Sequence, residues 1–486
     1  MDDDQRKTFD RLFSPKSLTI IGTSKAYSGL DGQFFLRNLQ RADFPGRVYL
    51  IDPITQEING LRTYPNISAL PEVVDLAIVC LPAKFVSSVL SECVHKGVRN
   101  VHILTSGFKE LRTPEGIQLE NEILRESLKG QLNIVGPNCM GPYVPASRLM
   151  LWGQIPANPG TFAFISQSDN LTQRMTEYAH FMGFGISKAV SFGNATVLDS
   201  TDYLGYLAED EGTRVIGFYL DSVQNARRFL DVARRLNRTK PLVLWKAGET
   251  ALEAGSVASN PTISREDRIW ENGLRQMGVT RVCSLEEMAC TAMALLNLPP
   301  PKGRRLFILG GGGGNSVYYA DVCLHLGLQI PPLTGETQEK ITALVPAVGS
   351  FARNPVDAWR SFHDPDFMKK ILDVAFSDQD LDMIILDRLI HQLTFGQPVY
   401  TDTTQLTIDY LQKNRMRKPV VVVVDGSGED PFLAEEAAKM RQFFCQARIP
   451  AYSSLPLATQ ALAHIVTYYE KIKSSRGTAS VDLADV

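Results

Sequence analysis

The chain has 486 residues, 44% of them hydrophobic, which suits about three domains of the usual ~150 residues. Its 50 basic and 53 acidic residues give a net charge of −3, so nothing indicates a nucleic acid or a membrane surface as partner. No apolar run approaches the ~18 residues of a membrane span, the acidic N-terminus has no signal segment, and the seven cysteines form no C-x-x-C pair. We therefore expect a cytoplasmic protein with reduced thiols.

The first element is a short apolar run, Leu18–Ile21, which predicts a buried parallel strand. It ends at Gly22, and a helix is expected to open near Gly32. Such a strand, glycine turn and helix start present free backbone N–H groups to a phosphate. The spacing of Gly22, Gly29 and Gly32 does not match G-x-G-x-x-G, so a tight strand-to-helix turn without ligand remains an alternative.

Further apolar runs follow at regular intervals and alternate with helical stretches, which predicts a doubly wound parallel sheet over residues 1–150. In such sheets the ligand lies beyond the carboxyl ends of the strands. Each expected strand ends in turn residues, so the turns should gather at one edge. The expected strands are Leu18–Ile21, Val48–Ile51, Leu76–Cys80, Val101–Leu104 and Asn133–Val135.

Asp52 supports a rival interpretation. It follows the second strand, 20 residues after Gly32, where a dinucleotide-binding domain places the acid that binds a ribose hydroxyl. A nicotinamide-dependent dehydrogenase is therefore an alternative. The long glycine loop, Pro53 and the lack of a catalytic His or Lys context downstream argue against it.

The motifs G-T-S…G…G, D-P, D-L-A-I-V-x-L-P-A, S-G-F-K-E and G-P-N-C-M-G, in this order, closely resemble the CoA-binding domain of NDP-forming acyl-CoA synthetases. That family includes the succinyl-CoA synthetase α-subunit and the ADP-forming acetyl-CoA synthetases. The resemblance implies a Rossmann-like domain that binds CoA. The residues it implies around CoA are Gly22, Thr23, Ser24, Pro53, Val79, Pro82, Ser106, Gly107 and Asn138. The family usually has Asn-Pro and a nearby lysine where this chain reads Asp52-Pro53-Ile54-Thr55, and a carboxylate there would repel the phosphates of CoA.

The second domain, expected over residues 151–300, repeats the alternation. Its turn Ser166–Asn170 can cap a helix or hold an anion. The motifs I-S-Q-S, V-S-F-G-N, D-Y-L-G-Y-L and K-P-L-V-L-W-K-A-G-E-T resemble the flavodoxin-like domain of the same synthetases. Its strands are expected at Phe162–Ile165, Ile186–Val190, Val215–Leu220 and Leu242–Trp245.

The family relays a phosphoryl group through a histidine, because an imidazole nitrogen can attack a phosphoryl donor and leave again. The resemblance aligns Asn260 with that histidine, and no histidine occurs between His180 and His325. An amide is a poor nucleophile. Asp221 stands where the family has the glutamate that orients the histidine, and Asp169 replaces a glycine after Ser-x-Ser. Three departures in one constellation predict that phosphohistidine formation is lost.

The third domain, expected over residues 301–470, follows the linker Pro299–Pro301. The strand Leu306–Leu309 runs into Gly310–Gly314, which could cradle a phosphate or let two backbones meet. Lys240-Pro241 recurs as Lys418-Pro419, which suggests two related flavodoxin-like domains, and Asn354–Asp357 resembles the family's N-P-V-D signature.

The remaining features of the third domain do not indicate a functional site. His363 and His391 are interpreted as structural or surface residues. Further strands are expected at Met383–Leu386 and Val420–Val424, and residues 471–486 are expected to form a mobile polar tail.

The predicted fold is therefore α/β, with a Rossmann-like CoA-binding domain followed by two flavodoxin-like domains. The predicted function is an α-type, CoA- or acyl-CoA-binding member of the synthetase family without a phosphohistidine, acting directly or in an oligomeric complex. No ATP-grasp segment follows the third domain, so an ATP-grasp β-type subunit is the implied partner. The alternatives are an active ADP-forming acid–CoA ligase that works with such a subunit, and the dehydrogenase. No metal site is predicted.

Overall fold

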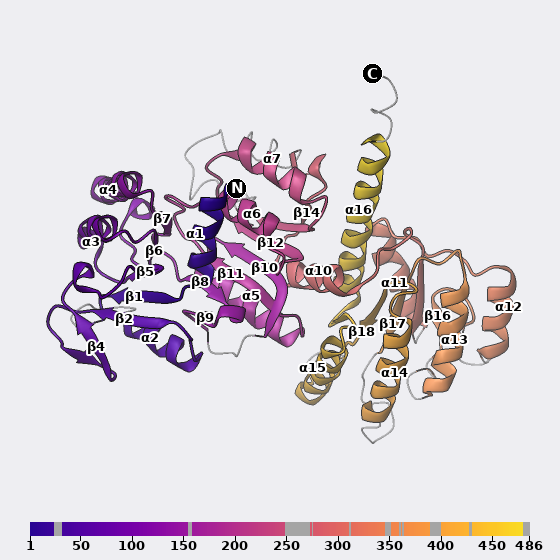
Figure 1. Ribbon diagram of the computed structural model, residues 1–486. Coiled ribbons are helices and arrows are strands. Elements are labelled where there is room, and N and C mark those ends of the chain that lie inside the picture. Colours follow the sequence, from indigo (N-terminus) through magenta and orange to yellow (C-terminus); the bar gives the residue numbers. More distant parts are fainter. Residues whose placement is uncertain are drawn as a thin grey trace. The chain divides into compact units, whose positions relative to one another are not determined.

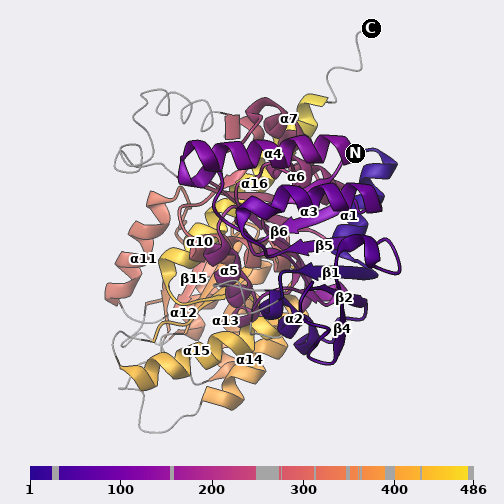
Figure 2. The same cartoon turned by 90° about the vertical axis from the view of Figure 1, so that its left-hand side faces the viewer.

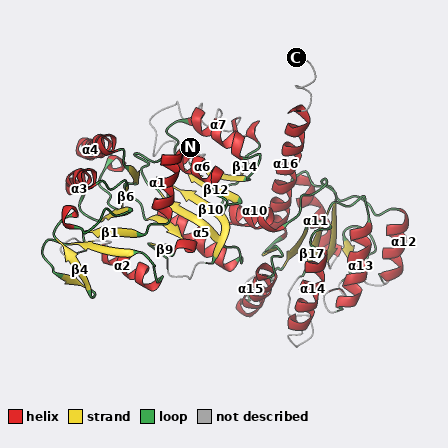
Figure 3. Cartoon of the chain, viewed as in Figure 1, coloured by secondary structure: helices red, strands yellow, loops and turns green. Residues whose placement is uncertain are grey.

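The computed structural model of the chain describes residues 1–23, 32–153, 158–247, 273–274, 276–310, 313–345, 351–358, 361, 364–388, 400–426 and 430–479. The chain divides into two compact units, one of residues 1–180 and 185–281 and the other of residues 181–184 and 282–486 (Figure 1). Each unit is built from strands gathered in sheets and flanked by helices (Figure 3).

The first sheet of the first unit is the predicted doubly wound sheet. Each of the five predicted strands is present, with its ends within one residue of the expected ones. β1 pairs in parallel with β2 on one side and with β5 on the other. The strand order is β3 (Glu57–Ile58), β4 (Leu61–Tyr64), β2 (Arg47–Ile51), β1 (Ser17–Ile21), β5 (Leu76–Val79), β6 (Asn100–Ile103) and β7 (Asn133–Val135).

The helices around this sheet begin at recognisable caps. Asp2 caps α1 (Asp3–Phe13) by accepting the N–H of Gln5 at 2.8 Å, and Thr113 caps α4 (Pro114–Gly130). α3 (Ala83–Lys96) lies beside α4 (Figure 2), and both contribute apolar side chains to the core under the sheet. The other elements are α2 (Gly32–Arg41) and the short 3-10 helices η1 (Ile67–Ala69), η2 (Lys109–Leu111) and η3 (Pro145–Ser147).

The second sheet of this unit contains the four strands predicted for the second domain. An antiparallel pair, β8 and β9, extends it beyond β11, and the sequence analysis did not predict this pair. The strand order is β14 (Thr280–Arg281), β13 (Leu242–Lys246), β12 (Val215–Leu220), β10 (Pro159–Ser166), β11 (Ile186–Ser191), β8 (Gly141–Val144) and β9 (Leu149–Met150). The helices described around this sheet include α5 (Asp169–Phe181), α6 (Ser200–Glu209) and α7 (Ala226–Leu236).

The second unit has a five-stranded parallel sheet in the order β16 (Val356–Asp357), β15 (Leu306–Gly310), β17 (Met383–Asp387), β18 (Val420–Val423) and β19 (Ala451–Tyr452). Its helices are α10 (Leu285–Asn297), α11 (Gly313–His325), α12 (Gly335–Leu344), α13 (Pro365–Ser377), α14 (Tyr400–Asn414), α15 (Pro431–Gln446) and α16 (Leu455–Ala479).

Two helices lie at the limits of this unit. α10 is grouped with the second unit, where it packs against α16, although the sequence places it in the expected second domain. Tyr452 donates its hydroxyl to the Cys290 carbonyl at 3.0 Å, and His464 contacts Glu287 at 2.9 Å. α16 also continues to Ala479, past the expected start of the mobile tail.

The repeated Lys-Pro motif has one structural role in both units. Lys240 Nζ donates to the carbonyl oxygens of Leu207 and Asp210, at 2.7 and 2.6 Å, near the end of α6. Lys418 Nζ donates to the carbonyl of Ala375, at 2.8 Å, and to that of Asp378, near the end of α13. Each lysine thus binds carbonyls at the end of the second helix before it in the chain, which agrees with two related domains.

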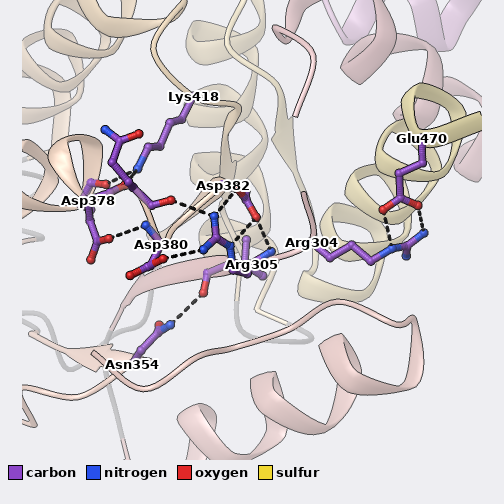
Figure 4. Close-up of polar contacts among 11 residues, drawn as sticks. Arg304, Arg305, Asn354, Asp378, Asp380, Asp382, Lys418 and Glu470 are labelled. Atoms are coloured by element: carbon purple, nitrogen blue, oxygen red, sulfur yellow. Dashed lines mark hydrogen bonds and ion pairs between the residues drawn. The ribbon is translucent and has the colours of Figure 1, made fainter. Parts of the chain in front are cut away.

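Polar contacts around β15 define the amino end of the second unit's sheet (Figure 4). Arg305 binds Asp382 through Nε and Nη2, both at 3.0 Å, and Asp380 at 2.8 Å. Asn354 donates to the Leu306 carbonyl at 2.8 Å and accepts the N–H of Ile308 at 3.1 Å. The asparagine of the N-P-V-D signature therefore pairs with β15 as a strand would.

Candidate CoA site in the first unit

The candidate site is the edge of the first sheet at which β1, β2, β5, β6 and β7 end. β1 lies between β2 and β5, so the strand order reverses at β1, and in such sheets the ligand lies beyond the carboxyl end of that strand. The turns after these strands are joined by hydrogen bonds: Cys80 N–H donates to the Ile21 carbonyl at 2.8 Å, and Leu104 N–H to the Val79 carbonyl at 3.1 Å.

Gly22 is required where it stands. Its φ is +93°, and a Cβ there would lie 2.6 Å from the carbonyl oxygen of Cys80. Its own carbonyl accepts the N–H of Gly32, the first residue of α2, at 3.1 Å. A bare backbone and the start of a helix therefore meet at the end of β1, which is the arrangement that accepts a phosphate.

Thr23 is the polar residue at this turn. It is fully buried, and its hydroxyl oxygen has no hydrogen-bond partner among the described residues. Its carbonyl accepts from Gln33 Nε2 at 2.9 Å. A buried hydroxyl without a partner beside a helix start fits a bound phosphate oxygen. Ser24, the next predicted contact, lies outside the described residues.

Asp52 is buried and closes its own turn. Its Oδ1 accepts the N–H groups of Ile54 and Thr55, both at 2.9 Å, while Oδ2 is buried without a partner among the described residues. Pro53 is exposed beside it. An asparagine could make the same two contacts, so they do not require the negative charge.

The remaining turns carry the other predicted contacts. Val79 is fully buried as the last residue of β5, and the half-buried Pro82 precedes α3. Ser106 is exposed, and Gly107 has φ +111°. Asn138 has φ +61° and is half-buried. The fold thus places Gly22, Thr23, Pro53, Val79, Pro82, Ser106, Gly107 and Asn138 at the carboxyl ends of neighbouring strands.

Two side chains behind these turns, Glu110 and Asn194, are not among the residues predicted from the sequence. Glu110 Oε1 accepts the N–H groups of Gly107 and Phe108, at 2.5 and 3.0 Å. Asn194 Oδ1 accepts from the side chain of Asn138 at 3.3 Å. Glu110 is part of the S-G-F-K-E motif, so its position in that motif was a usable signal.

Two of the residues interpreted as a degenerate relay follow strands of the second sheet, Asp169 after β10 and Asp221 after β12. Gln167 Oε1 accepts the backbone N–H groups of Asp221 and Ser222, at 2.8 and 3.0 Å, and Asp221 is exposed. Asp169 accepts the Met140 N–H at 2.9 Å and the Ser191 hydroxyl, and burial raises the pKa of its carboxyl despite both hydrogen bonds. Asn260 lies outside the described residues.

Two classes of feature are missing from the described ranges. No group of three or more His, Cys, Asp or Glu side chains there could hold a metal ion. No helix among those residues is long and apolar enough to cross a membrane. His363 and His391 lie outside the described ranges.

Three family models match the chain in order. They are a CoA binding domain at residues 16–144, a succinyl-CoA ligase like flavodoxin domain at 159–295, and a ligase-CoA domain at 306–476. The α-subunit of acetate–CoA ligase (ADP-forming) I from Pyrococcus furiosus is 33% identical over 463 residues, which cover 94% of this chain and 96% of that subunit. The chain belongs to the NDP-forming acyl-CoA synthetase family.

Other members of the synthetase family are similar to this chain in sequence and in structure. The dinucleotide-forming acetyl-coenzyme A synthetase 1 of Ca. Korarchaeum cryptofilum, in its apo form, has a TM-score of 0.82 at 30% identity over 96% of this chain and 99% of that one. Acetate–CoA ligase (ADP-forming) I of Archaeoglobus fulgidus is 34% identical over 77% of this chain, which spans only 54% of its length. CoA is therefore the cofactor of this synthetase-family chain, and the α/β fold with one CoA-binding and two ligase-type domains is confirmed.

Proposed function

We propose that this chain is an α-type synthetase that binds CoA or acyl-CoA at the edge of its first sheet and does not form a phosphohistidine. The observation that carries the first half is the turn at Gly22. Bare backbone and the start of α2 come together there with the Thr23 hydroxyl, which has no partner among the described residues. The second half rests on Asn260 at the aligned relay position.

The proposed CoA contacts are the nine residues that the family resemblance implies. Thr23 and the backbone of the turn at Gly22 would face the diphosphate, because they lie beside the start of α2. Ser106 and Asn138, from turns after β6 and β7, offer polar groups further along the same edge. Pro53, Val79, Pro82, Gly107 and Ser24 complete the proposed set.

Loss of the relay is supported by the neighbours of the missing histidine. Asp221 is one methylene shorter than glutamate, and Lys246 Nζ binds its backbone carbonyl at 2.8 Å. Asp169 already accepts two hydrogen bonds from Met140 and Ser191, so it has a structural role at the start of α5. We therefore expect neither carboxylate to orient an imidazole at position 260.

Phosphoryl labelling tests this proposal. The chain is incubated with a β-type ATP-grasp subunit, γ-labelled ATP and CoA, and phosphohistidine is measured on the α chain. We expect no label. Label on a histidine would overturn the loss of the relay without bearing on CoA binding.

A single substitution refines the test. Asn260→His alone should leave the chain unlabelled, because Asp221 and Asp169 are unsuited to orient and stabilise the phosphoimidazole. Strong labelling of this variant would show that the neighbours matter less than the histidine.

The second candidate function is an active ADP-forming acid–CoA ligase, in which an ATP-grasp subunit delivers phosphate directly to the acid. The naming of the Pyrococcus furiosus relatives as subunits alpha favours a multisubunit arrangement. Acyl-CoA formation in the reconstituted mixture without protein labelling would select this candidate. If no acyl-CoA forms, the remaining interpretation is that the chain serves as a CoA-binding partner in a complex.

Calorimetry of the purified chain with CoA, acetyl-CoA and NAD in parallel separates the synthetase proposal from the dehydrogenase alternative. We expect binding of the first two only. An oligomeric state and a cytoplasmic location remain predictions, the latter supported by seven free cysteines.

A further inference from the structure

Asn194 connects two turns of the proposed CoA site from the opposite domain. It follows β11 of the second sheet and has a half-buried side chain. Its backbone N–H donates to the Pro137 carbonyl at 3.0 Å, and its Oδ1 accepts from Asn138 Nδ2 at 3.3 Å. The backbone N–H and the side-chain oxygen of Asn194 therefore both bind the turn after β7.

The amide nitrogen of Asn194 holds the turn after β6. Its two hydrogens are shared between two carboxylates, since Nδ2 lies 2.6 Å from Glu110 Oε2 and 3.0 Å from Glu120 Oε2. Glu120 is buried and also accepts the Lys109 N–H at 3.1 Å. Without a shared donor, two neighbouring carboxylates would repel each other.

Glu110 links Asn194 to the turn that carries Ser106, one of the proposed CoA contacts. Its other oxygen accepts the consecutive N–H groups of Gly107 and Phe108, which fixes the orientation of the turn that carries Ser106. Burial raises the pKa of Glu110, but the hydrogen bonds from Asn194, Phe108 and Gly107 outweigh it, so the pKa is lowered overall. The carboxylate is thus held in its charged form.

Close backbone packing keeps the two domains together at this point. A Cβ on Gly193 would lie 2.2 Å from the carbonyl oxygen of Asn138, so the turn before Asn194 sits directly on the turn after β7. Thr196 N–H also donates to the Gly136 carbonyl at 3.2 Å. A shift of either turn would move the other.

We propose that Asn194 and Glu110 are a pair of positioning residues that hold the Ser106–Gly107 and Asn138 turns in register, so that CoA binding to the first domain depends on the second. This inference rests on the proposed CoA site and extends it to residues that do not touch the ligand. It predicts that the two side chains act as one unit.

A double-mutant cycle on the full chain tests the pair, with CoA affinity measured by calorimetry. Asn194→Ala and Glu110→Ala should each weaken binding about tenfold, the value of one charge-assisted hydrogen bond. The double variant should also lose about tenfold, whereas independent residues would lose about 100-fold. Gln118→Ala, on the exposed side of α4, is the control and should bind as the wild type does.

A second pair of variants keeps the test valid if the alanine variants fail to fold. Thermal unfolding without CoA checks whether each variant is folded. Glu110→Gln and Asn194→Asp each put two like groups together, while the double variant restores an amide–carboxylate contact in the reverse sense. We expect it to regain affinity over Asn194→Asp, in which the new carboxylate meets those of both Glu110 and Glu120. Wild-type affinity in the single variants, or additive losses, would overturn the inference. A wild-type chain that does not bind CoA would instead overturn the proposed function and the inference with it.

Discussion

Gly22 and Cys80 approach so closely that a single added Cβ at Gly22 would lie 2.6 Å from the Cys80 carbonyl oxygen. This contact joins the turn after β1 to the turn after β5, at the point where the sheet opens. It leaves backbone, not side chain, facing the proposed diphosphate.

The first prediction concerns this contact. Gly22→Ala should lower the free energy of unfolding by about 2–4 kcal/mol and abolish measurable CoA binding, because the methyl group must displace the Cys80 carbonyl. Gly97→Ala is the matched control: its φ is +90°, but a Cβ there would have nothing within 4 Å. It should cost only about 1–2 kcal/mol of backbone strain and leave CoA affinity unchanged. Equal effects in the two variants would place the ligand elsewhere.

The second prediction concerns Asp52. Asp52→Asn keeps the contacts to Ile54 and Thr55 and removes a negative charge from the proposed site. CoA affinity should rise about fivefold at low ionic strength, since a like charge near a phosphate costs on the order of 1 kcal/mol. The gain should shrink as salt is added. Calorimetry at two salt concentrations checks both statements, and unchanged or weaker binding would contradict them.

The third prediction concerns the fully buried Asp387 at the end of β17. Tyr319 donates its hydroxyl to Asp387 Oδ2 at 2.5 Å, yet burial raises the pKa of the Asp387 carboxyl from 3.8 to about 6, with Asp425 adding to the shift and Arg388 opposing it. Between these values the folded chain holds a proton that the unfolded chain has lost. The free energy of unfolding therefore falls as pH rises through this interval.

Asp387→Asn should remove this dependence. Relative to the variant, the wild type should lose on the order of 1–3 kcal/mol of unfolding free energy between pH 4 and pH 7. Denaturant titrations at several pH values measure the difference. The exposed Asp409→Asn serves as control and should keep the wild-type pH profile. Parallel profiles for wild type and Asp387→Asn would refute the prediction.

The fourth prediction concerns the Lys-Pro repeat. Lys418→Met should lower the free energy of unfolding by about 1–3 kcal/mol, because the carbonyls of Ala375 and Asp378 lose their donor. Lys413→Met, on the exposed face of α14, should change stability by less than about 0.5 kcal/mol. Thermal or urea unfolding compares the two. Similar losses in both variants would show that the helix-end contact is unimportant.

Several conclusions could be reached from the amino-acid sequence alone. Continuous apolar runs such as Leu18–Ile21 and Val215–Leu220, bounded by turn residues, predict strands buried on both faces, and the structure contains them. The order of the motifs identifies the family and its cofactor. The proposed loss of the relay histidine, at Asn260, also rests on the sequence.

Other features depend on residues far apart in the chain. α10 belongs to the second unit because it packs against α16. The sequence of α10 alone does not indicate which helix it packs against. The contact of Asn194 with Glu110 joins residues 84 positions apart. Local periodicity determined the strands, because backbone pairing and burial follow from neighbouring side chains. Only the tertiary structure decided which turns meet and which polar side chains support them, because those contacts depend on how whole sheets pack.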